Sequence, residues 1–332
     1  MARISKLTIP TPYLVGDVNL YLVEDEKLTL IDTGAPTDEA LNALENGLRA
    51  LGYEIRDVSE IIVTHFHPDH FGLAGFLAQK TGATIRMHPL DYYFLEEKEE
   101  DAQAIANSWG LPRSLLNKVI KHQYHIPPKY LVKDFVLKPL AGGEIIKTGE
   151  FAFKVFHTPG HSLGHVALYE QNKKYFISGD FLIKNIFPNP LIYQVEGQRI
   201  KTLPLFLKSL ANVSELSVEM VFPAHQELFQ DFSVVIRKIK KHYLQKAVEI
   251  YETLKRIKKG SLFEIALMVY PEEIKTQTYL VLSKVLGCLD LLVNSGLLIE
   301  DKGIFFYNKT GFAVKNILNE SYFHLYNGDE EF

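Results

Sequence analysis

The chain has 332 residues, of which 47% are hydrophobic, and its 36 Lys and Arg against 40 Asp and Glu give a formal net charge of -4. This composition is that of an ordinary folded protein, and it excludes a disordered chain, a collagen-like repeat and a charged tail. The negative charge excludes a global attraction to nucleic acid or to an anionic membrane, so binding of either kind needs a local basic patch.

The single cysteine and the N-terminal residues indicate the compartment. Cys288 cannot form an intrachain disulfide, and the apolar run around it favours a small buried side chain. No apolar stretch of signal-peptide length precedes Pro10, and no window approaches the roughly 18 apolar residues of a membrane span. We therefore expect a cytoplasmic protein with no membrane contact.

Strand and helix patterns alternate over the first 64 residues. Two apolar runs within residues 18–34 flank a turn-like tripeptide and predict the strands of a hairpin. Leucines recur at helical spacing over residues 38–51, which predicts a helix. The apolar triplet in residues 59–64 predicts a further strand that ends at a cluster of histidines.

That cluster, residues 65–70, reads His-Phe-His-Pro-Asp-His and holds four ligand-type side chains within six residues. In an extended segment, alternation puts His65 and His67 on the same side, and Asp69 and His70 follow directly. Imidazole and carboxylate are donors that zinc prefers, and a preceding strand gives them a rigid support. One histidine alone would indicate only a hydrogen-bonded loop residue, but this combination predicts a metal site.

The next segments supply further donors. Residues 88–138 are rich in charged and aromatic side chains and predict a helical insertion, whereas residues 144–178 predict three strands separated by loops. His161, Asp180 and His225 each follow a strand-like segment. Ligands delivered from the ends of different strands are how a sheet assembles a site at one edge.

Together these motifs resemble the metallo-β-lactamase superfamily. The matching motifs are the Asp-Thr-Gly loop at Asp32, the histidine cluster at 65–70, the Thr-Pro-Gly-His loop ending at His161, the Gly-Asp at Asp180 and the Pro-Ala-His at His225. Their order and spacing agree with the family over roughly residues 3–230. The resemblance implies an α/β fold, an αββα sandwich that holds two metal ions.

Carried over position by position, the resemblance implies two zinc ions, although the same donors also suit iron or manganese. His65, His67 and His161 would bind one ion and Asp69, His70 and His225 the other, with Asp180 bridging the two. Asp32 would orient a ligand imidazole by accepting its hydrogen bond, the alternative being a turn-capping role, and His165 would brace the His161 loop.

The implied reaction is hydrolysis by a metal-bound hydroxide, because two divalent ions lower the pKa of a bridging water towards neutrality. We assign catalytic roles to Asp69 and Asp180, with Asp180 holding both ions. This chemistry requires no serine or cysteine nucleophile.

The subfamilies that the chain resembles differ in substrate. The commonest zinc β-lactamases use a metal-binding cysteine, whereas Cys288 is far from every motif. Glyoxalase II shares all seven ligand types, but its glutathione-binding Cys-Gly-Arg segment after the bridging aspartate is missing here. Quorum-quenching lactonases carry a tyrosine where this chain has Ile183 and Lys184, and flavodiiron proteins carry a glutamate in place of His67.

The C-terminal third predicts three helices over 243–257, 261–269 and 278–294, followed by a hairpin over 297–307. This order resembles the winged-helix-like domain of a superfamily subgroup that includes a beta-lactamase-like endoribonuclease. Nine basic and two acidic residues between Arg237 and Lys259 are a candidate phosphate-contacting face. Lysines on a surface helix are commonly only solvated, and winged helices also serve in packing or in a homodimer.

We therefore expect a catalytic domain over 1–235, with the insertion at 88–138, and a winged-helix-like domain over 236–332. The expected function is a zinc-dependent hydrolase. Its substrate is either a small-molecule ester, thioester or lactone, as the glyoxalase-like ligand set suggests, or single-stranded RNA, as the basic helix suggests. A nucleic-acid-binding regulator with a structural metal is a further alternative, although structural zinc sites are usually closed and four-coordinate.

Overall fold

The computed structural model describes residues 2–95, 126–132 and 134–309. The described chain forms two compact units, the first made of 2–95, 126–132, 134–188 and 216–235 and the second of 189–215 and 236–309. Residues 189–215, which the sequence analysis places in the catalytic domain, thus pack with the C-terminal unit. Most of the expected insertion, residues 96–125, lies outside the described residues.

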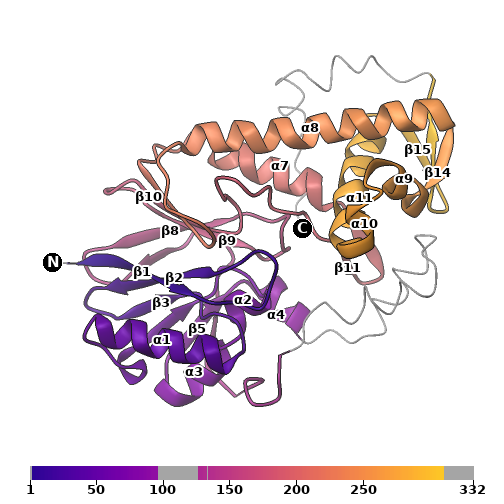
Figure 1. Cartoon of the computed structure of the whole chain (residues 1–332). Helices are drawn as coiled ribbons and strands as arrows, with labels where there is room; N and C mark the ends of the chain where they lie inside the picture. The colour runs from indigo at the N-terminus through magenta and orange to yellow at the C-terminus, as the bar shows by residue number, and fades with distance from the viewer. Residues whose placement is uncertain (1, 96–125, 133, 310–332) are drawn as a thin grey trace. The chain divides into compact units, whose positions relative to one another are not determined.

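The first unit contains a six-stranded sheet in the order β1-β2-β3-β4-β5-β6 (Figure 1). Its strands are β1 (Arg3–Ile9), β2 (Val18–Glu24), β3 (Thr29–Ile31), β4 (Glu60–Ile62), β5 (Thr84–Met87) and β6 (Leu137–Pro139). The first three strands pair antiparallel and the last four pair parallel. The predicted hairpin and the strand before the histidines are confirmed, whereas β1, β5 and β6 were not predicted, and β6 begins within the expected helical insertion.

A five-stranded sheet in the order β13-β10-β9-β8-β7 faces the first sheet. Its strands are β7 (Ile145–Lys147), β8 (Ala152–His157), β9 (Val166–Glu170), β10 (Tyr175–Gly179) and β13 (Met220–Pro223). Only β10 and β13 pair parallel. Apolar side chains of both sheets, including Tyr21 and Ile62 from one and Phe153 and Ile177 from the other, form one buried core between them. The unit is therefore an α/β sandwich.

Helices α1 (Asp38–Ala50) and α3 (Ala74–Thr81) cover the outer face of the six-stranded sheet (Figure 1). Helix α1 begins where Thr37 Oγ1 accepts a hydrogen bond from the Ala40 amide, and it buries the predicted leucine stripe. The 3₁₀-helix η1 (Ile55–Asp57), α2 (Pro68–Phe71) and α4 (Pro89–Leu95) are shorter connections.

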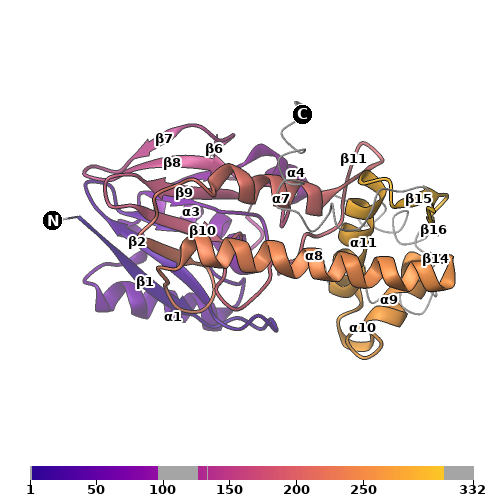
Figure 2. The same cartoon turned by 90° about the horizontal axis from the view of Figure 1, so that it is seen from above.

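The second unit begins with the hairpin β11 (Tyr193–Val195) and β12 (Gln198–Ile200), followed by α7 (Thr202–Val213). Helix α8 (Phe232–Ile257) then continues into β14 (Lys259–Ser261), α9 (Leu262–Val269), α10 (Glu273–Thr276), α11 (Thr278–Asn294), β15 (Leu298–Asp301) and β16 (Ile304–Tyr307) (Figure 2). The last three strands pair in the order β14-β16-β15. The predicted helices and hairpin are present, although α8 begins eleven residues earlier than expected, at 232 instead of 243.

Two further expectations concern burial and membranes. Cys288 on α11 is fully buried, as its apolar surroundings predicted. Among the described residues, no helix combines the length and the apolar character that crossing a bilayer requires.

Because the two sheets share one core, replacing an isoleucine by alanine should lower the free energy of unfolding more at a buried position than at an exposed one. Ile177→Ala on β10, whose side chain is 1% exposed, should lower the free energy of unfolding by about 2–5 kcal/mol through lost burial and a cavity. Ile145→Ala on β7 of the same sheet is the matched control, because Ile145 is 61% exposed and should cost less than about 1 kcal/mol. Urea denaturation followed by circular dichroism measures both, and equal losses would contradict the two-sheet core.

Candidate metal centre

The strand ends bring the predicted site residues to one edge of the sandwich. Asp32 follows β3 and His65 follows β4, and these strands run parallel. Asp180 follows β10 and His225 follows β13, which are also parallel. His161 lies in the loop after β8, which runs in the same direction as β10 because β9 pairs antiparallel with both. Parallel strands end at the same edge, so each sheet contributes side chains there.

The short helix α2 provides the remaining two donors. His67 is its N-cap residue and Pro68 its first residue, a position that suits the fixed backbone of proline. Asp69 and His70 follow within the same turn, and Thr33 holds this turn because its hydroxyl donates to the His70 carbonyl oxygen at 2.7 Å. The sequence Pro-Asp-His thus turns both side chains towards the strand ends.

The donor atoms gather in two groups, within each of which all atoms lie within 4.8 Å of one another. The first donor group consists of His65, His67, His161 and Asp180, and the second of Asp69, His70 and His225. All seven residues are buried, at most 8% exposed. The structure therefore brings together every residue that the sequence analysis proposed as a metal ligand.

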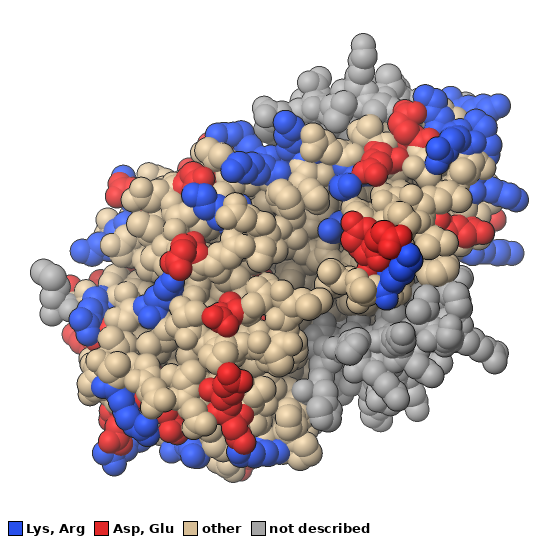
Figure 3. Space-filling view, viewed as in Figure 1, with Lys and Arg blue, Asp and Glu red and all other residues tan. Residues whose placement is uncertain are grey.

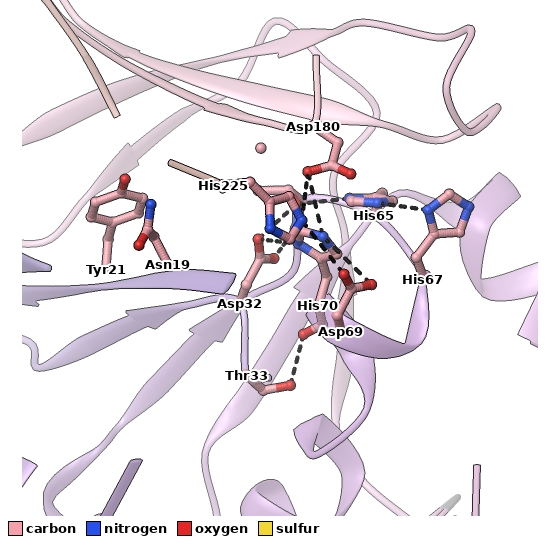
Figure 4. A network of polar contacts seen from close by, with 12 residues as sticks. Asn19, Tyr21, Asp32, Thr33, His65, His67, Asp69, His70, Asp180 and His225 are labelled. Atoms are coloured by element: carbon pink, nitrogen blue, oxygen red, sulfur yellow. Dashed lines mark hydrogen bonds and ion pairs between the residues drawn. The ribbon is translucent and has the colours of Figure 1, made fainter. Parts of the chain in front are cut away.

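Asp180 faces both groups, with one carboxylate oxygen directed to each (Figure 4). Its Oδ2 lies 3.3 Å from His161 Nε2 in the first group. Its Oδ1 lies 3.4 Å from His225 Nε2 and 3.6 Å from His70 Nε2 in the second group. The arrangement suits a carboxylate that bridges two cations.

These separations fit shared metal ligation better than hydrogen bonding. Hydrogen bonds span about 2.7–3.2 Å, whereas two ligand atoms about 2.0–2.1 Å from one tetrahedral zinc ion lie about 3.3 Å apart. Within the described residues, the buried Nε2 atoms of His70 and His225 and Oδ1 of Asp180 have no hydrogen-bond partner. Leaving such a group unsatisfied costs about 1–3 kcal/mol, which a bound cation would offset. The donor set thus fits two divalent metal ions.

Hydrogen bonds on the far side of each imidazole fix which nitrogen faces the centre. His70 donates its Nδ1 proton to Asp32 Oδ2 at 2.8 Å. His225 donates its Nδ1 proton to the Asp17 carbonyl oxygen at 2.7 Å, because a carbonyl can only accept. In both rings Nε2 is consequently the nitrogen available to a metal, and the partner at Nδ1 increases its basicity.

Asp32 also controls His65 through Thr64. The Thr64 hydroxyl donates to Asp32 Oδ2 at 2.8 Å and the Thr64 amide donates to Oδ1 at 2.7 Å. Because its proton is engaged, the hydroxyl accepts from His65 Nδ1 at 3.1 Å and leaves His65 Nε2 facing inwards. Asp32 has a φ of 60°, a left-handed conformation that aspartate tolerates better than most residues. One carboxylate thus orients an imidazole of each donor group.

His165 lies beside the centre but belongs to neither donor group. Its Nε2 accepts a hydrogen bond from the Asp180 amide at 3.2 Å, and its Nδ1 contacts the Thr158 hydroxyl at 2.7 Å. A Cβ at Gly179, which has a φ of 50°, would approach His165 Nε2 to 2.8 Å. His165 therefore positions the backbone of Asp180, and glycine at 179 leaves room for that contact.

In the metal-free centre, the imidazole of His65 is neutral and that of His70 is charged. Burial, reinforced by the neighbouring histidines, holds the pKa of His65 well below its usual value, so this ring is neutral. Burial also lowers the pKa of His70, but the carboxylates of Asp69, Asp32 and Asp180 outweigh it and raise that pKa to about 10. Burial likewise opposes ionisation of Asp180, but His225 and His70 hold its pKa well below the usual range. His70 thus supplies a positive charge that a metal ion would replace.

Residues outside the motifs complete the supports. Asn19 Nδ2 donates to the carbonyl oxygens of Pro223 and Gln226, at 3.1 and 2.6 Å, on either side of His225 (Figure 4). Asp91 on α4 accepts hydrogen bonds from the loops of both His65 and His161. These hydrogen bonds lower the pKa of Asp91, but burial outweighs them and raises that pKa to about 6. Asn19 and Asp91 were not predicted, because their partners are mainly backbone groups that leave no mark in the sequence. Thr64 was not predicted either, because its partner Asp32 is 32 residues away along the chain.

Comparison with known proteins agrees with this geometry. The profile of the Metallo-beta-lactamase superfamily matches residues 13–225, which contain every donor residue. A probable metallo-hydrolase of Bacillus subtilis is 26% identical over 295 residues, 86% of this chain and 91% of that protein. A hydroxyacylglutathione hydrolase of Haemophilus influenzae is 26% identical over 177 residues, 53% of this chain and 71% of that protein.

Among solved structures, a metallo-beta-lactamase family protein from Thermus thermophilus is similar with a TM-score of 0.77 and 25% identity. The match covers 92% of this chain and 98% of that one. Since the profile ends at residue 225, the resemblance to this structure extends into the second unit.

The raised pKa of His70 predicts that metal binding releases protons. At pH 7 the metal-free ring is protonated, and its Nε2 must lose that proton before it can bind a metal. Apparent zinc affinity should therefore rise, by up to about tenfold per pH unit, until about pH 10. In the metal-free protein, the stabilisation from charged His70 is complete below the unfolded-state pKa of about 6.5 and is lost as pH rises through about 10.

Calorimetric zinc titration in two buffers of different ionisation enthalpy counts the released protons. We expect release of about one proton or more per protein at pH 7. His242→Gln on α8 is a suitable comparison, because burial lowers the pKa of His242 to about 4 and this histidine belongs to neither donor group, so its loss should not change the count. Zinc uptake at pH 7 without proton release would contradict the charged state of His70.

Proposed function

The chain belongs to the metallo-β-lactamase superfamily, and from that premise we propose that it is a hydrolase with two metal ions, one in each donor group. Superfamily membership and the relatives indicate a metal-dependent hydrolase. The observation that carries the dinuclear proposal is Asp180, whose two oxygens face different donor groups. Zinc is the proposed metal, because imidazole and carboxylate donors suit it, and iron or manganese remains an alternative for the same donors.

The side chains define how such a centre would be used. When bound, two divalent ions acidify water and stabilise the negative charge that develops on a substrate oxygen. Asp180 would hold both ions and Asp69 would balance charge in the second group, in keeping with the catalytic roles assigned to both. His65, His70 and His225 are fully buried, whereas Asp69, Asp180, His67 and His161 keep 7–8% exposure. Substrate would therefore approach from the side of those four residues.

The loop between β1 and β2 supports an apolar substrate group. Tyr13 is 38% exposed, and partial burial of its phenol, with a contribution from the Asp69 carboxylate, raises its pKa to about 12, so that the hydroxyl is a neutral hydrogen-bond donor. The adjacent Leu14 is 86% exposed. His225 donates to Asp17 at the end of the same loop, so the loop is anchored to the centre. An acyl chain would find both apolar contact and a donor there.

We propose a small thioester or ester as the substrate class. The relative named hydroxyacylglutathione hydrolase supports thioester cleavage. The residues after Asp180 do not favour a glutathione-specific site, because Phe181, Leu182 and Ile183 are at most 2% exposed and pack in the interior. Hydrolysis of acyl thioesters without a strong preference for the glutathione carrier is therefore the expected specificity.

A second candidate, cleavage of single-stranded RNA, is favoured by the basic helix α8. Most of its basic residues are exposed, and Figure 3 shows Lys and Arg gathered over this helix. Lys246 pairs with Glu249 at 2.8 Å and Lys255 with Glu252 at 3.4 Å, which reduces the free positive charge. Small-molecule hydrolysis therefore remains our first proposal.

We propose that the second unit is winged-helix-like, because its elements follow one another in the order β14-α9-α10-α11-β15-β16. In helix-turn-helix proteins the last helix reads base edges. Here α11 carries one basic residue, Lys284, and is otherwise largely apolar and buried. If this unit binds nucleic acid, α8 would contact phosphates and no helix would read bases. If it does not, its role would be packing or dimerisation.

Asp180→Asn tests the dinuclear hydrolase. An amide cannot bridge two cations as a carboxylate does, so thioester hydrolysis should fall by at least on the order of a hundredfold and metal content from two ions towards one. Metal analysis and steady-state rates on an acyl-CoA, S-lactoylglutathione and a simple aryl ester measure this. Asp57→Asn in exposed η1 is the control and should change neither quantity. Two retained ions with unchanged rates in Asp180→Asn would refute the bridging role.

Cleavage of labelled single-stranded RNA tests the second candidate. If phosphate contacts on α8 hold the substrate, cleavage should fall by about 10³-fold or more between 50 and 200 mM salt. The double substitution Arg237→Glu with Lys241→Glu should weaken it, whereas Lys174→Glu in the first unit should not. Absence of cleavage by the fully metallated wild type would remove this candidate and leave the thioester proposal.

A further inference from the structure

Asp91 on α4 connects the two loops that carry the histidines of the first donor group. Its Oδ2 accepts from the Phe66 amide at 3.1 Å and from the Ser162 hydroxyl at 2.6 Å, and its Oδ1 accepts from the Gly164 amide. The carboxylate has 0% exposure. One buried side chain thus joins a loop that follows β4 in the first sheet to a loop that follows β8 in the second.

The partners of Asp91 are immediate neighbours of metal-ligand candidates. Phe66 lies between His65 and His67, and Ser162 follows His161. These three histidines belong to the first donor group, and their rings lie close together, with centroids 4.6 Å apart for His67 and His161. No hydrogen bond described for Asp91 involves residues 69, 70 or 225 of the second donor group.

We propose that Asp91 is a positioning residue for the first metal site alone. The inference rests on the proposed dinuclear function, and it adds that the first metal site has a support of its own besides Asp32, which orients a histidine of each donor group. Asp91 touches no reacting atom. It acts by fixing the distance between His65 and His67 on one loop and His161 on the other.

The physical basis is that these ligands come from different sheets. A metal site tolerates displacements of only about 0.5 Å, and residues that support ligands commonly change metal affinity by about 10–100-fold when they are removed. An added Cβ at Gly164 would lie 2.6 Å from Asp91 Oδ1, so glycine at 164 is what allows the carboxylate to approach. The two loops are therefore held at one distance by a buried contact with no spare room.

Asp25 provides a matched control because it makes the same kinds of contact elsewhere. Its carboxylate accepts from the Thr148 hydroxyl at 2.9 Å and from the Glu150 and Phe151 amides at 3.1 and 2.9 Å. Like Asp91, it receives one hydroxyl and two backbone amides from a segment distant in the sequence. It belongs to neither donor group.

The test measures cobalt binding to each site separately. In a His225→Ala background the first donor group remains complete, and in a His161→Ala background the second does. We expect Asp91→Asn to weaken cobalt binding about 10–100-fold in the first background and less than about threefold in the second. Titration followed by the visible d–d absorption of cobalt reports both affinity and ligand geometry, without any substrate.

Thermal unfolding of the metal-free proteins separates positioning from general stability. Asp25→Asn should lower the unfolding temperature and leave both cobalt affinities unchanged. Gly164→Ala disturbs the same contact from the opposite loop. It should weaken cobalt binding at the first site and not at the second, and it replaces Asp91→Asn in the test if that variant does not fold. Equal weakening of both sites by Asp91→Asn, or unchanged affinity at the first, would overturn the inference. Failure of the wild type to bind a second cobalt would instead overturn the proposed dinuclear function.

Discussion

The central constraint on this structure is that five imidazoles and two carboxylates are buried together at one edge of a sandwich. Within the described residues, Nε2 of His70, Nε2 of His225 and Oδ1 of Asp180 lack hydrogen-bond partners, and the aspartate oxygen lies 3.6 and 3.4 Å from the two nitrogens. Such groups are costly to bury unless a cation satisfies them. The strands before each donor, the α2 turn and the supporting loops all serve to hold this arrangement in place.

Specific hydrogen bonds convert that cluster into an ordered centre. Asp32 orients His70 directly and His65 through Thr64, while a backbone carbonyl orients His225. Each outer partner engages Nδ1 and leaves Nε2 facing inwards. The centre is therefore organised before any metal arrives, which reduces the reorganisation that binding requires. Support comes from residues of both sheets, and neither sheet alone holds a complete donor group.

The sequence was sufficient to predict which donor side chains come together and several of the strands around them, because donor residue types at short spacing after apolar runs are local patterns. It did not predict Asp91, whose partners are 25 to 73 residues away and are mostly backbone amides that every residue except proline possesses. Helix α7 was also missed. The apolar side chains of α7 pack in the second unit. Hydrophobic periodicity indicates that a helix has a buried face, but it does not indicate which domain core that face packs against.

The distribution of donors along the chain has a consequence for biosynthesis. His65 and His67 belong to a loop of the first sheet, whereas Asp180 and His225 follow strands of the second, near the end of the first unit. Contacts between such distant residues form late in folding, because loop closure must precede them. The first donor group needs Asp180 after β10, and the second needs His225 after β13, which pairs with β10. The second donor group therefore cannot be complete while β13 is still within the ribosome, so loading of the two proposed metal ions would follow translation of the whole sandwich.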